Sequence, residues 1–287
     1  MSEKPVADIS IIAPNYNNGR FLIEFVESIV NSTVLPRELI IIDDGSTDES
    51  TTVLERYSYL AVLRTIRFHE NRGLTEALNA GLEIATGKYI MRADPDDILI
   101  PERIERQYHY METHPETGVA GCNVQYFHDK TGKNINVSNF PTDHADIVKA
   151  YKQGVNGVQH PTAIIRRSII SRYSYRTVLT GEDYEIFSTM ARDGHRFANL
   201  AEPLYRMRIH PKSLTSNLNL SAIRNIFGIR DRIWGTKTPG IRILLYYLYI
   251  CSYRKYQLST NWFVRYCYLF VSGMCFPVRI FKRLFRK

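Results

Sequence analysis

The sequence places three carboxylates within four residues, at Asp94, Asp96 and Asp97, directly after the apolar run 89–91. Carboxylates this close repel one another unless a cation or a hydrogen-bond donor is present. Hard divalent ions prefer oxygen ligands, and Mg²⁺ commonly joins one or two carboxylates to substrate phosphates. The cluster therefore indicates metal-assisted phosphate chemistry, although a solvated acidic turn has the same spacing.

Two further acidic groups follow apolar runs or open a helix. Asp44 ends the run 39–42, where it is suited to accept from a nucleobase or ribose, and equally to form a turn. Asp183 follows Glu182 at the predicted start of a helix, where acidic residues are favoured by the helix dipole.

Cations end the last recognisable strand of the sequence, with Arg206, Arg208 and His210 close together. Such a cluster suits a diphosphate, and an ordinary polar loop has the same composition. A lone histidine favours the second interpretation.

The elements that must position these residues alternate along the chain. Strands are predicted at 9–14, 39–42, 62–68 and 89–91, helices at 21–30 and 74–85, and, later in the chain, a helix at 182–192 and strands at 197–200 and 204–209. Ser46 and Glu49 have capping-box spacing and predict a helix of roughly ten residues.

This alternation predicts an α/β fold, in which a mostly parallel central sheet lies between two layers of helices. In such sheets ligands bind at the carboxyl ends of the strands. The polar clusters 15–18, 43–48 and 94–97 all follow predicted strands. We therefore expect them at one edge of the sheet.

Composition excludes several other classes of protein. The 287 residues are 44% hydrophobic and 23% charged, which is ordinary for a globular chain and excludes disorder, collagen and a disulfide scaffold. The net charge of +8 comes from the tail, because residues 241–287 contain nine Lys/Arg and no Asp/Glu. The near-neutral body lacks the basic surface of a nucleic-acid-binding domain.

The spacing of motifs also counts against several classes of nucleotide-binding and zinc-binding protein. The loop after the first predicted strand, PNYNNGR, has neither GxGxxG nor GxxxxGK[ST], which counts against a dinucleotide fold and a P-loop. The four cysteines show no zinc-ligand spacing. Without an apparent signal peptide, a cytoplasmic location with reduced thiols is expected.

The tail predicts contact with a membrane. It contains 13 of the 34 aromatic residues and two uncharged stretches, at 243–253 and 266–278. Neither stretch reaches the roughly 20 apolar residues that span a bilayer. Amphipathic helices lying on the anionic inner face of the cell membrane are expected, and a helical pair packed on protein is the alternative.

Taken together, these blocks resemble the family 2 glycosyltransferases, particularly bacterial members that build surface polysaccharides. The resemblance covers residues 8–217 and is carried by the segments PNYNNGRFLIEFVESI, LIIIDDGSTDES, KYIMRADPDDILIPERI, HPTAIIRRS, GEDYEIFSTMARDG and LYRMRIHPKSLT. It implies a GT-A catalytic domain over residues 1–217, followed by a helical tail over 218–287. It also implies a nucleotide-sugar donor, with a UDP-sugar as the first candidate, a Mn²⁺ or Mg²⁺ ion, and inversion at the anomeric carbon.

The resemblance assigns roles residue by residue. Asp183 would be the base that deprotonates a hydroxyl of a glycan or lipid-linked acceptor, while Asp96 and His210 would bind the metal. The donor would be held by Pro14, Tyr16, Asn18, Asp44 and Asp94.

Two positions depart from the family pattern. Pro95 stands where a small residue is usual, and Leu78 stands where many relatives have arginine. A non-catalytic sugar-binding module of the same fold and a nucleotidyltransferase are the alternatives. The presence of Asp96 and Asp183 disfavours the first, and the lack of a Gly-rich basic loop disfavours the second.

Overall fold

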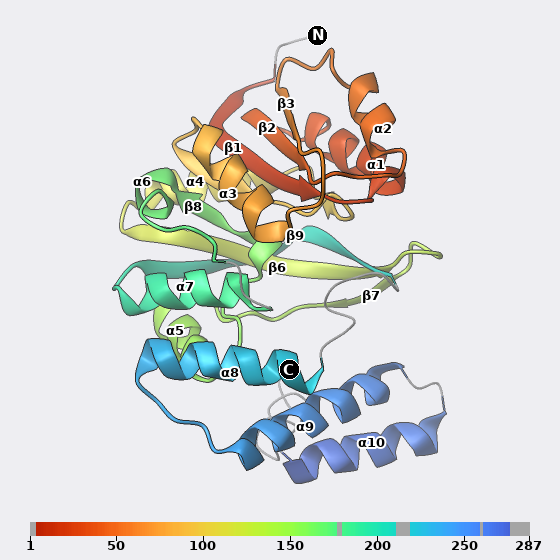
Figure 1. Ribbon diagram of the computed structural model, residues 1–287, viewed down its shortest axis with the longest axis vertical. Coiled ribbons are helices and arrows are strands. Elements are labelled where there is room, and N and C mark those ends of the chain that lie inside the picture. The colour runs from red at the N-terminus through yellow and green to blue at the C-terminus, as the bar shows by residue number, and fades with distance from the viewer. Residues whose placement is uncertain (1–3, 177–179, 211–218, 259–260, 276–287) are drawn as a thin grey trace. The chain divides into compact units, whose positions relative to one another are not determined.

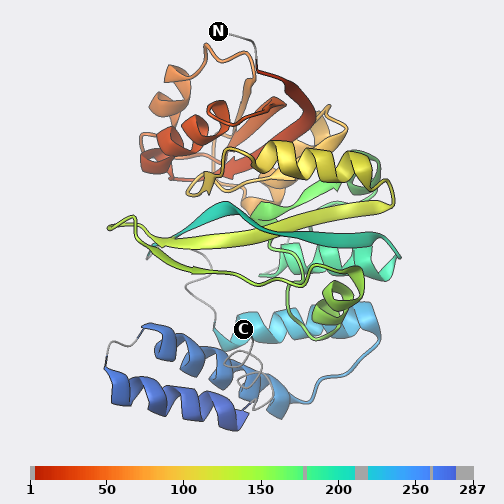
Figure 2. The ribbon, with the colours of Figure 1, turned by 180° about the vertical axis from the view of Figure 1, so that it is seen from behind.

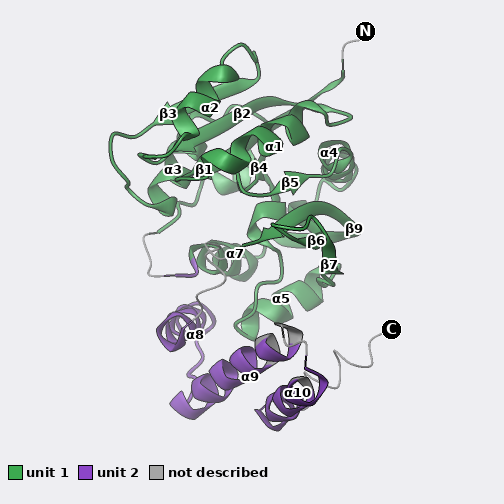
Figure 3. Cartoon of the chain, turned by 90° about the vertical axis from the view of Figure 1, so that its right-hand side faces the viewer, with its two compact units in different colours: residues 1–178, 182–213 green, residues 179–181, 214–287 purple. Residues whose placement is uncertain are grey.

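The computed structural model describes residues 4–176, 180–210, 219–258 and 261–275. The chain divides into two compact units, residues 1–178 with 182–213 and residues 179–181 with 214–287 (Figure 3). The boundary expected at 217/218 falls outside the described residues.

A nine-stranded sheet forms the first unit, in the order β3-β2-β1-β4-β8-β6-β9-β5, with β7 paired to β6. The strands are β1 (Val6–Asn15), β2 (Leu35–Asp43), β3 (Leu63–Arg67), β4 (Tyr89–Arg92), β5 (Ile98–Leu99), β6 (Thr117–His128), β7 (Asn134–Val137), β8 (Ile164–Arg166) and β9 (Arg196–Ile209). Strands β1 to β4 run parallel, as expected, and so do β6 and β9. The short β8 joins these two parallel parts by antiparallel pairing with β4 and β6.

Helices of the first unit lie between and after these strands. They are α1 (Gly19–Val30), α2 (Ser50–Arg56), α3 (Leu74–Ile84), α4 (Arg103–Thr113), α5 (His144–Lys152), the 3-10 turn η1 (His160–Thr162), α6 (Arg167–Ile170) and α7 (Glu182–Arg192).

Both faces of the parallel strands are covered, because their apolar runs are too continuous to leave one face in water. Figure 1 shows α3 on one face, where a Cβ added at Gly81 would lie 2.6 Å from Ile12 Cγ2. Figure 2, from behind, shows α1 and α4 on the other face. There Leu22 and Phe25 are buried with Ile11. The predicted three-layer α/β architecture is therefore confirmed.

One helix start was predicted wrongly. Ser46 does not cap α2, which begins at Ser50 and has seven residues rather than roughly ten. The Ser46 hydroxyl instead accepts from the Asn17 amide N at 2.9 Å. Near the start of α2, the Asp48 carboxylate accepts hydrogen bonds from Ser50 N at 3.0 Å and from Gly19 N at 2.9 Å. Long-range contacts with the first loop outweighed the local capping pattern.

The two strands predicted at 197–200 and 204–209 form one strand, β9. Its pairing with β6 shifts register between Cys122 and Val124, opposite Leu200 to Tyr205. This irregularity lies where the sequence has Ala201-Glu202-Pro203, which suggested a break. A proline is tolerated at such a bulge, so the strand continues to Ile209.

The second unit is helical. It contains α8 (Leu220–Trp234), α9 (Gly240–Leu258) and α10 (Trp262–Cys275). The Phe227 ring of α8 meets Tyr246 of α9 at 5.3 Å, and Lys255 of α9 lies 5.3 Å from the Tyr268 ring of α10. Among the described helices, none combines the length and apolar character needed to cross a bilayer.

Candidate active site

The three clustered carboxylates lie in a tight loop at the carboxyl end of β4. One oxygen from each of Asp94, Asp96 and Asp97 lies within 4.8 Å of the others. A hydrogen bond from Asp97 N to Asp94 O, at 3.1 Å, closes the turn around Pro95. The loop is anchored on β1, where Ala93 N donates to Ile12 O.

Asp94 is held by Arg92 at the end of β4 and by Tyr205 of β9. Its Oδ1 accepts from Arg92 Nη2 at 2.6 Å, and its amide N donates to the Tyr205 hydroxyl at 2.9 Å. Arg92 is only 4% exposed, so this ion pair is largely desolvated on the arginine side. Sequence patterns did not mark Arg92, because it lies within the strand.

Strand β9 brings the other partners of the loop. The Arg208 amide N donates to Asp97 Oδ1 at 2.7 Å, and its Nε donates to Asp96 O at 2.8 Å. His210 Nε2 lies 2.9 Å from Asp96 Oδ2. The His210 ring packs 5.2 Å from Phe21 of α1. Thus His210 and Asp96 are neighbours, as their proposed shared role requires.

The loop fits a divalent cation. Burial raises the pKa of Asp94, and repulsion from Asp96 adds to this although Arg92 opposes it. Burial, with repulsion from Asp96 and Asp94, raises the pKa of Asp97 well above its usual range. A cation would relieve this repulsion, and carboxylate oxygens suit Mn²⁺ or Mg²⁺. Asp94 already accepts from Arg92 and Asp97 from Arg208, so Asp96, with His210 beside it, is the main candidate for a metal ligand.

Arg208 does not provide the free cation that the sequence suggested for a diphosphate. It is 7% exposed, and its guanidinium pairs with Glu24 and with Asp129 Oδ1, the latter at 3.2 Å. It also lies 4.7 Å from the Phe21 ring. Arg208 therefore holds the carboxylate loop and α1 in place, and its guanidinium is already paired with acidic groups of the protein.

The carboxyl end of β2 is organised by Asp44. This carboxylate is 3% exposed, and its two oxygens accept from Arg72 N at 2.7 Å and Gly73 N at 2.9 Å. Gly45 beside it has φ +68°, and a Cβ there would lie 2.5 Å from the carbonyl carbon of Glu70. Asp44 thus holds the loop before α3, which limits the oxygens that it can offer a nucleotide.

The segment after β1 lies beside this loop. Pro14 is buried in β1 opposite Ile42 of β2, whereas Tyr16 is 47% exposed and offers a free ring face. Asn18 is half-buried at the start of α1, and its carbonyl accepts from Phe21 N at 2.8 Å. Tyr16, on an exposed bend at the carboxyl end of β1, is the best placed of the three to stack on a base.

Asp183 is the second residue of α7, and each of its oxygens accepts one hydrogen bond. Asn156 Nδ2 donates to Oδ2 at 2.8 Å, and Tyr184 N donates to Oδ1 at 2.7 Å. Burial raises the pKa of Asp183 to about 7, and repulsion from Glu182 adds to the increase. A carboxyl with this pKa can accept a proton near neutral pH, which is the property of a general base.

Tyr175 is a buried tyrosine in the segment between α6 and α7. Burial raises its pKa, Arg92 lowers it and Asp183 raises it, so the two charged groups act on one phenol. The hydroxyl lies 2.8 Å from His160 Nε2. Asn79 of α3 bonds both the N and the O of the Tyr175 backbone, each at 2.9 Å. Sequence reasoning missed this tyrosine because it lies in an irregular segment.

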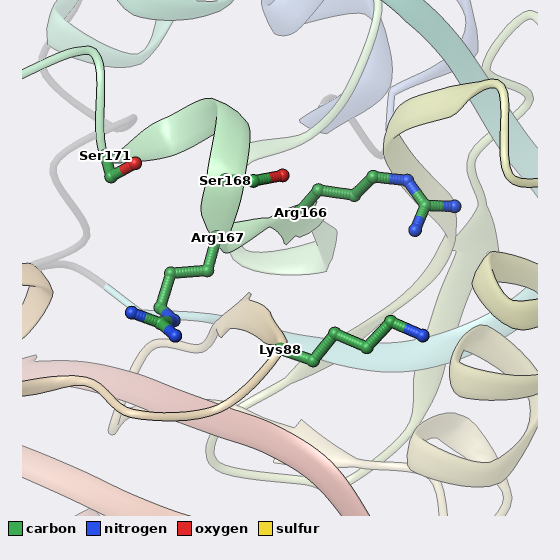
Figure 4. Close-up of a pocket in the computed structure, with 5 residues that line it drawn as sticks. All are labelled: Lys88, Arg166, Arg167, Ser168 and Ser171. Atoms are coloured by element: carbon green, nitrogen blue, oxygen red, sulfur yellow. The ribbon is translucent and has the colours of Figure 1, made fainter.

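A separate cavity of about 260 Å³ lies at the opposite, amino-terminal end of β4 (Figure 4). It is lined by Lys88, Arg166, Arg167, Ser168 and Ser171. The cationic groups are already engaged, Lys88 with Glu112 at 2.6 Å and Arg167 with Gly87 O at 2.8 Å. The cavity is therefore remote from the strand-end site and does not form part of it.

The fold of the chain is the GT-A fold, as its likeness to two solved structures shows. S. aureus TarS 1-349 in complex with UDP-GlcNAc is similar with a TM-score of 0.60 and 17% identity, over 95% of this chain and 82% of that one. A mannosyltransferase from Pyrobaculum calidifontis, PcManGT in complex with GDP-Man and Mn²⁺, is similar with a TM-score of 0.60 and 16% identity, over 99% and 79%. At these identities the likeness shows the fold.

The sequence comparison identifies the family. Residues 10–174 match glycosyl transferase family 2. The amylovoran biosynthesis glycosyltransferase AmsE of Erwinia amylovora is 32% identical, over 83% of this chain and 91% of that protein. The putative glycosyltransferase EpsE of Bacillus subtilis is 30% identical, over 70% and 72%. The chain belongs to glycosyl transferase family 2 and is an enzyme that transfers sugar, as its sequence motifs indicated.

Proposed function

We propose that the protein transfers a sugar from a nucleoside diphosphate sugar to a hydroxyl of a glycan or lipid-linked acceptor in surface polysaccharide synthesis. A UDP-sugar is the first candidate for the donor. The observations that carry this are the cluster of Asp94, Asp96 and Asp97 at the carboxyl end of β4 and the Asp183 carboxyl, whose pKa burial raises to about 7. The amylovoran role in the name of AmsE and the UDP-GlcNAc bound to TarS support the acceptor and donor classes.

The donor site follows from the groups at the carboxyl ends of β1, β2 and β4. Tyr16 offers its exposed ring to the nucleobase, and Asp44 keeps the facing loop in place. Asp96 and His210, with Asp94 beside them, would hold Mn²⁺ or Mg²⁺. A bound ion would supply positive charge where negative charge develops on the departing diphosphate.

The transfer step needs a base because an acceptor hydroxyl is a poor nucleophile near neutral pH. The acceptor oxygen attacks the anomeric carbon on the face opposite the diphosphate and gives its proton to Asp183. A new C–O bond forms, and the bond to the phosphate oxygen breaks with its electron pair leaving on the nucleoside diphosphate. One displacement inverts the anomeric centre and leaves no sugar on the enzyme.

A panel of nucleotide sugars tests the donor class. We expect UDP-sugars with Mn²⁺ to raise the thermal midpoint of the full-length chain, since any ligand that binds only the folded state stabilises it. GDP- and ADP-sugars with Mn²⁺, and UDP-sugars in EDTA, serve as controls. Protection by none of the donors, measured by scanning fluorimetry, would count against a nucleotide-sugar enzyme.

The proposal includes a peripheral position on the inner face of the cell membrane, which rests on α10. Its outer face carries Trp262, Tyr266, Phe270 and Met274, each 61–72% exposed. Their spacing of four residues aligns them along one side of the helix. A contiguous apolar stripe of this kind is typical of a surface that another apolar phase covers.

The positive charge of the tail favours an anionic lipid surface as the phase that covers this apolar stripe. Residues 241–287 contain nine Lys/Arg and no Asp/Glu, and the anionic leaflet attracts each basic residue with about 1 kcal/mol near the surface. The basic residues Arg279, Lys282, Arg283, Arg286 and Lys287, predicted to border the apolar face, lie outside the described residues. With 14 residues, α10 is shorter than the roughly 20 apolar residues that span a bilayer, so it would lie in the interface plane.

We expect the full-length protein to sediment with phosphatidylglycerol vesicles and less with phosphatidylcholine vesicles, and to dissociate as salt rises. The double variant Trp262→Ser, Phe270→Ser should bind roughly 10²-fold more weakly, because each large apolar side chain contributes about 1.5 kcal/mol or more. Ile135→Ser, Val137→Ser, on the exposed strand β7, is the matched control.

Unchanged vesicle binding by the double variant would show that the stripe does not contact lipid. A concentration-dependent dimer that the double variant loses would assign the stripe to a second copy of the chain.

A further inference from the structure

The base candidate is oriented by a residue that no sequence motif marked. Asn156 lies in the loop between α5 and η1, 27 residues before Asp183. Its Nδ2 donates to Asp183 Oδ2 at 2.8 Å, while Tyr184 N donates to Oδ1 at 2.7 Å. Each oxygen therefore has one donor, which fixes the plane of the carboxylate and leaves a lone pair on each oxygen.

The loop that carries Asn156 is held on both sides. A Cβ added at Gly157 would lie 2.7 Å from Ile147 Cγ2 and 2.8 Å from Ile147 O, so only glycine allows the loop to pack this closely on α5. The Gly157 carbonyl accepts from Asn199 Nδ2 at 2.9 Å. Val158 N donates to the Tyr151 hydroxyl at 3.2 Å. These contacts immediately after Asn156 give its amide little freedom.

We propose that Asn156 is a positioning residue for the reaction, whose amide holds the Asp183 carboxylate in its charged form and in the orientation that receives the acceptor proton. The inference rests on the proposed role of Asp183 as the base. A hydrogen bond to the ionised form of an acid favours that form, and it is among the stronger bonds in proteins.

The electrostatic surroundings make this bond important. Burial, followed by repulsion from Glu182, raises the pKa of Asp183 to about 7, and the bonds from Tyr184 N and Asn156 oppose the increase. Two tyrosines of neighbouring segments, Tyr151 of α5 and Tyr175, are also affected by the charge of Asp183. Burial raises the pKa of both phenols. Both therefore stay neutral in the range where Asp183 titrates, and Asn156 remains the side chain that stabilises the carboxylate.

The pH dependence of kcat/KM tests the proposal. In the wild type, transfer should rise as pH increases through about 7, because Asp183 loses its proton there. Asn156→Leu keeps a similar volume without a donor, so the rising limb should move up by roughly one pH unit. Activity lost at pH 7 should then be recovered near pH 9, with donor affinity unchanged by calorimetry.

Two further variants make the outcome decisive. Gln153→Ala, at an exposed position of the same loop, should leave the limb in place. Asn156→Asp keeps the shape and adds a carboxylate, so it should move the limb at least as far as Asn156→Leu and carries the test if that variant does not fold. A limb that stays near pH 7 in the Asn156 variants, with rates lowered equally at all pH values or not at all, overturns the proposal.

Failure of the proposed function gives a different result. If Asp183→Asn still transfers sugar, the base assignment itself is wrong. If Asp183→Asn is inactive and the limb of the Asn156 variants does not move, only the inference about Asn156 is wrong.

Discussion

The Asp183→Asn variant is expected to fold and bind donor like the wild type but to transfer sugar about 10²–10⁴-fold more slowly, the usual loss when a general base is removed. The amide keeps the shape of the side chain and can still meet Tyr184 N. It cannot accept a proton at pH 7, which is the property that burial gives to the carboxyl. Transfer of radiolabelled sugar to acceptor, with donor affinity from calorimetry, separates chemistry from binding.

Glu182→Gln is the matched control, because it removes the neighbouring charge and leaves Asp183 in place. This variant should lose less of the transfer rate than Asp183→Asn. Because the repulsion between Glu182 and Asp183 is removed, the rising limb of the pH profile should shift to lower pH. If Glu182→Gln proves inactive while Asp183→Asn works, the two roles are reversed. Equal activity of both variants would place the base elsewhere.

The Asp96→Asn variant should lose metal-dependent donor binding. Loss of groups that merely orient a metal ligand costs about 10–100-fold in affinity, so losing a ligand charge should cost about 10²-fold or more. Calorimetry of UDP with and without Mn²⁺ measures this, and the affinity of the variant should fall to that of the wild type in EDTA.

Asp146→Asn, at an exposed position in the first turn of α5, is the control for the loss of one negative charge. Wild-type affinity that is equal in Mn²⁺ and in EDTA would falsify the metal assignment. An unaffected Asp96→Asn variant, with the wild type still metal-dependent, would move the ligand role to Asp94 or Asp97.

Local patterns predicted the half of the sheet that carries the proposed donor site. Apolar runs followed by acidic residues mark the ends of β2 and β4, and parallel strands bring those ends together. The same reasoning failed at Ser46, because its hydroxyl meets Asn15 and Asn17 across the sheet edge instead of the next helix. Capping rules describe neighbours in sequence, and this serine takes its partners from a distant loop.

The supporting residues of the site were not predictable for the same reason. Arg92 looks like an interruption of a buried strand until Asp94 is seen beside it. Asn156 sits in a loop with no regular pattern, and its partner lies on α7. The sequence left Arg208 open between a diphosphate ligand and a polar loop, because its acidic partners, Glu24 and Asp129, come from two remote segments.

The position of β9 between β6 and β5 has a consequence for how the enzyme is made. During translation the carboxylate loop leaves the ribosome long before its partners, since Arg208 follows Asp97 by 111 residues and His210 follows Asp96 by 114. Until then β5 lacks the strand that it pairs with, and Asp96 and Asp97 lack their partners His210 and Arg208. A nascent chain that ends with residue 174 thus holds the whole family-matched region and still lacks the strand that completes the site.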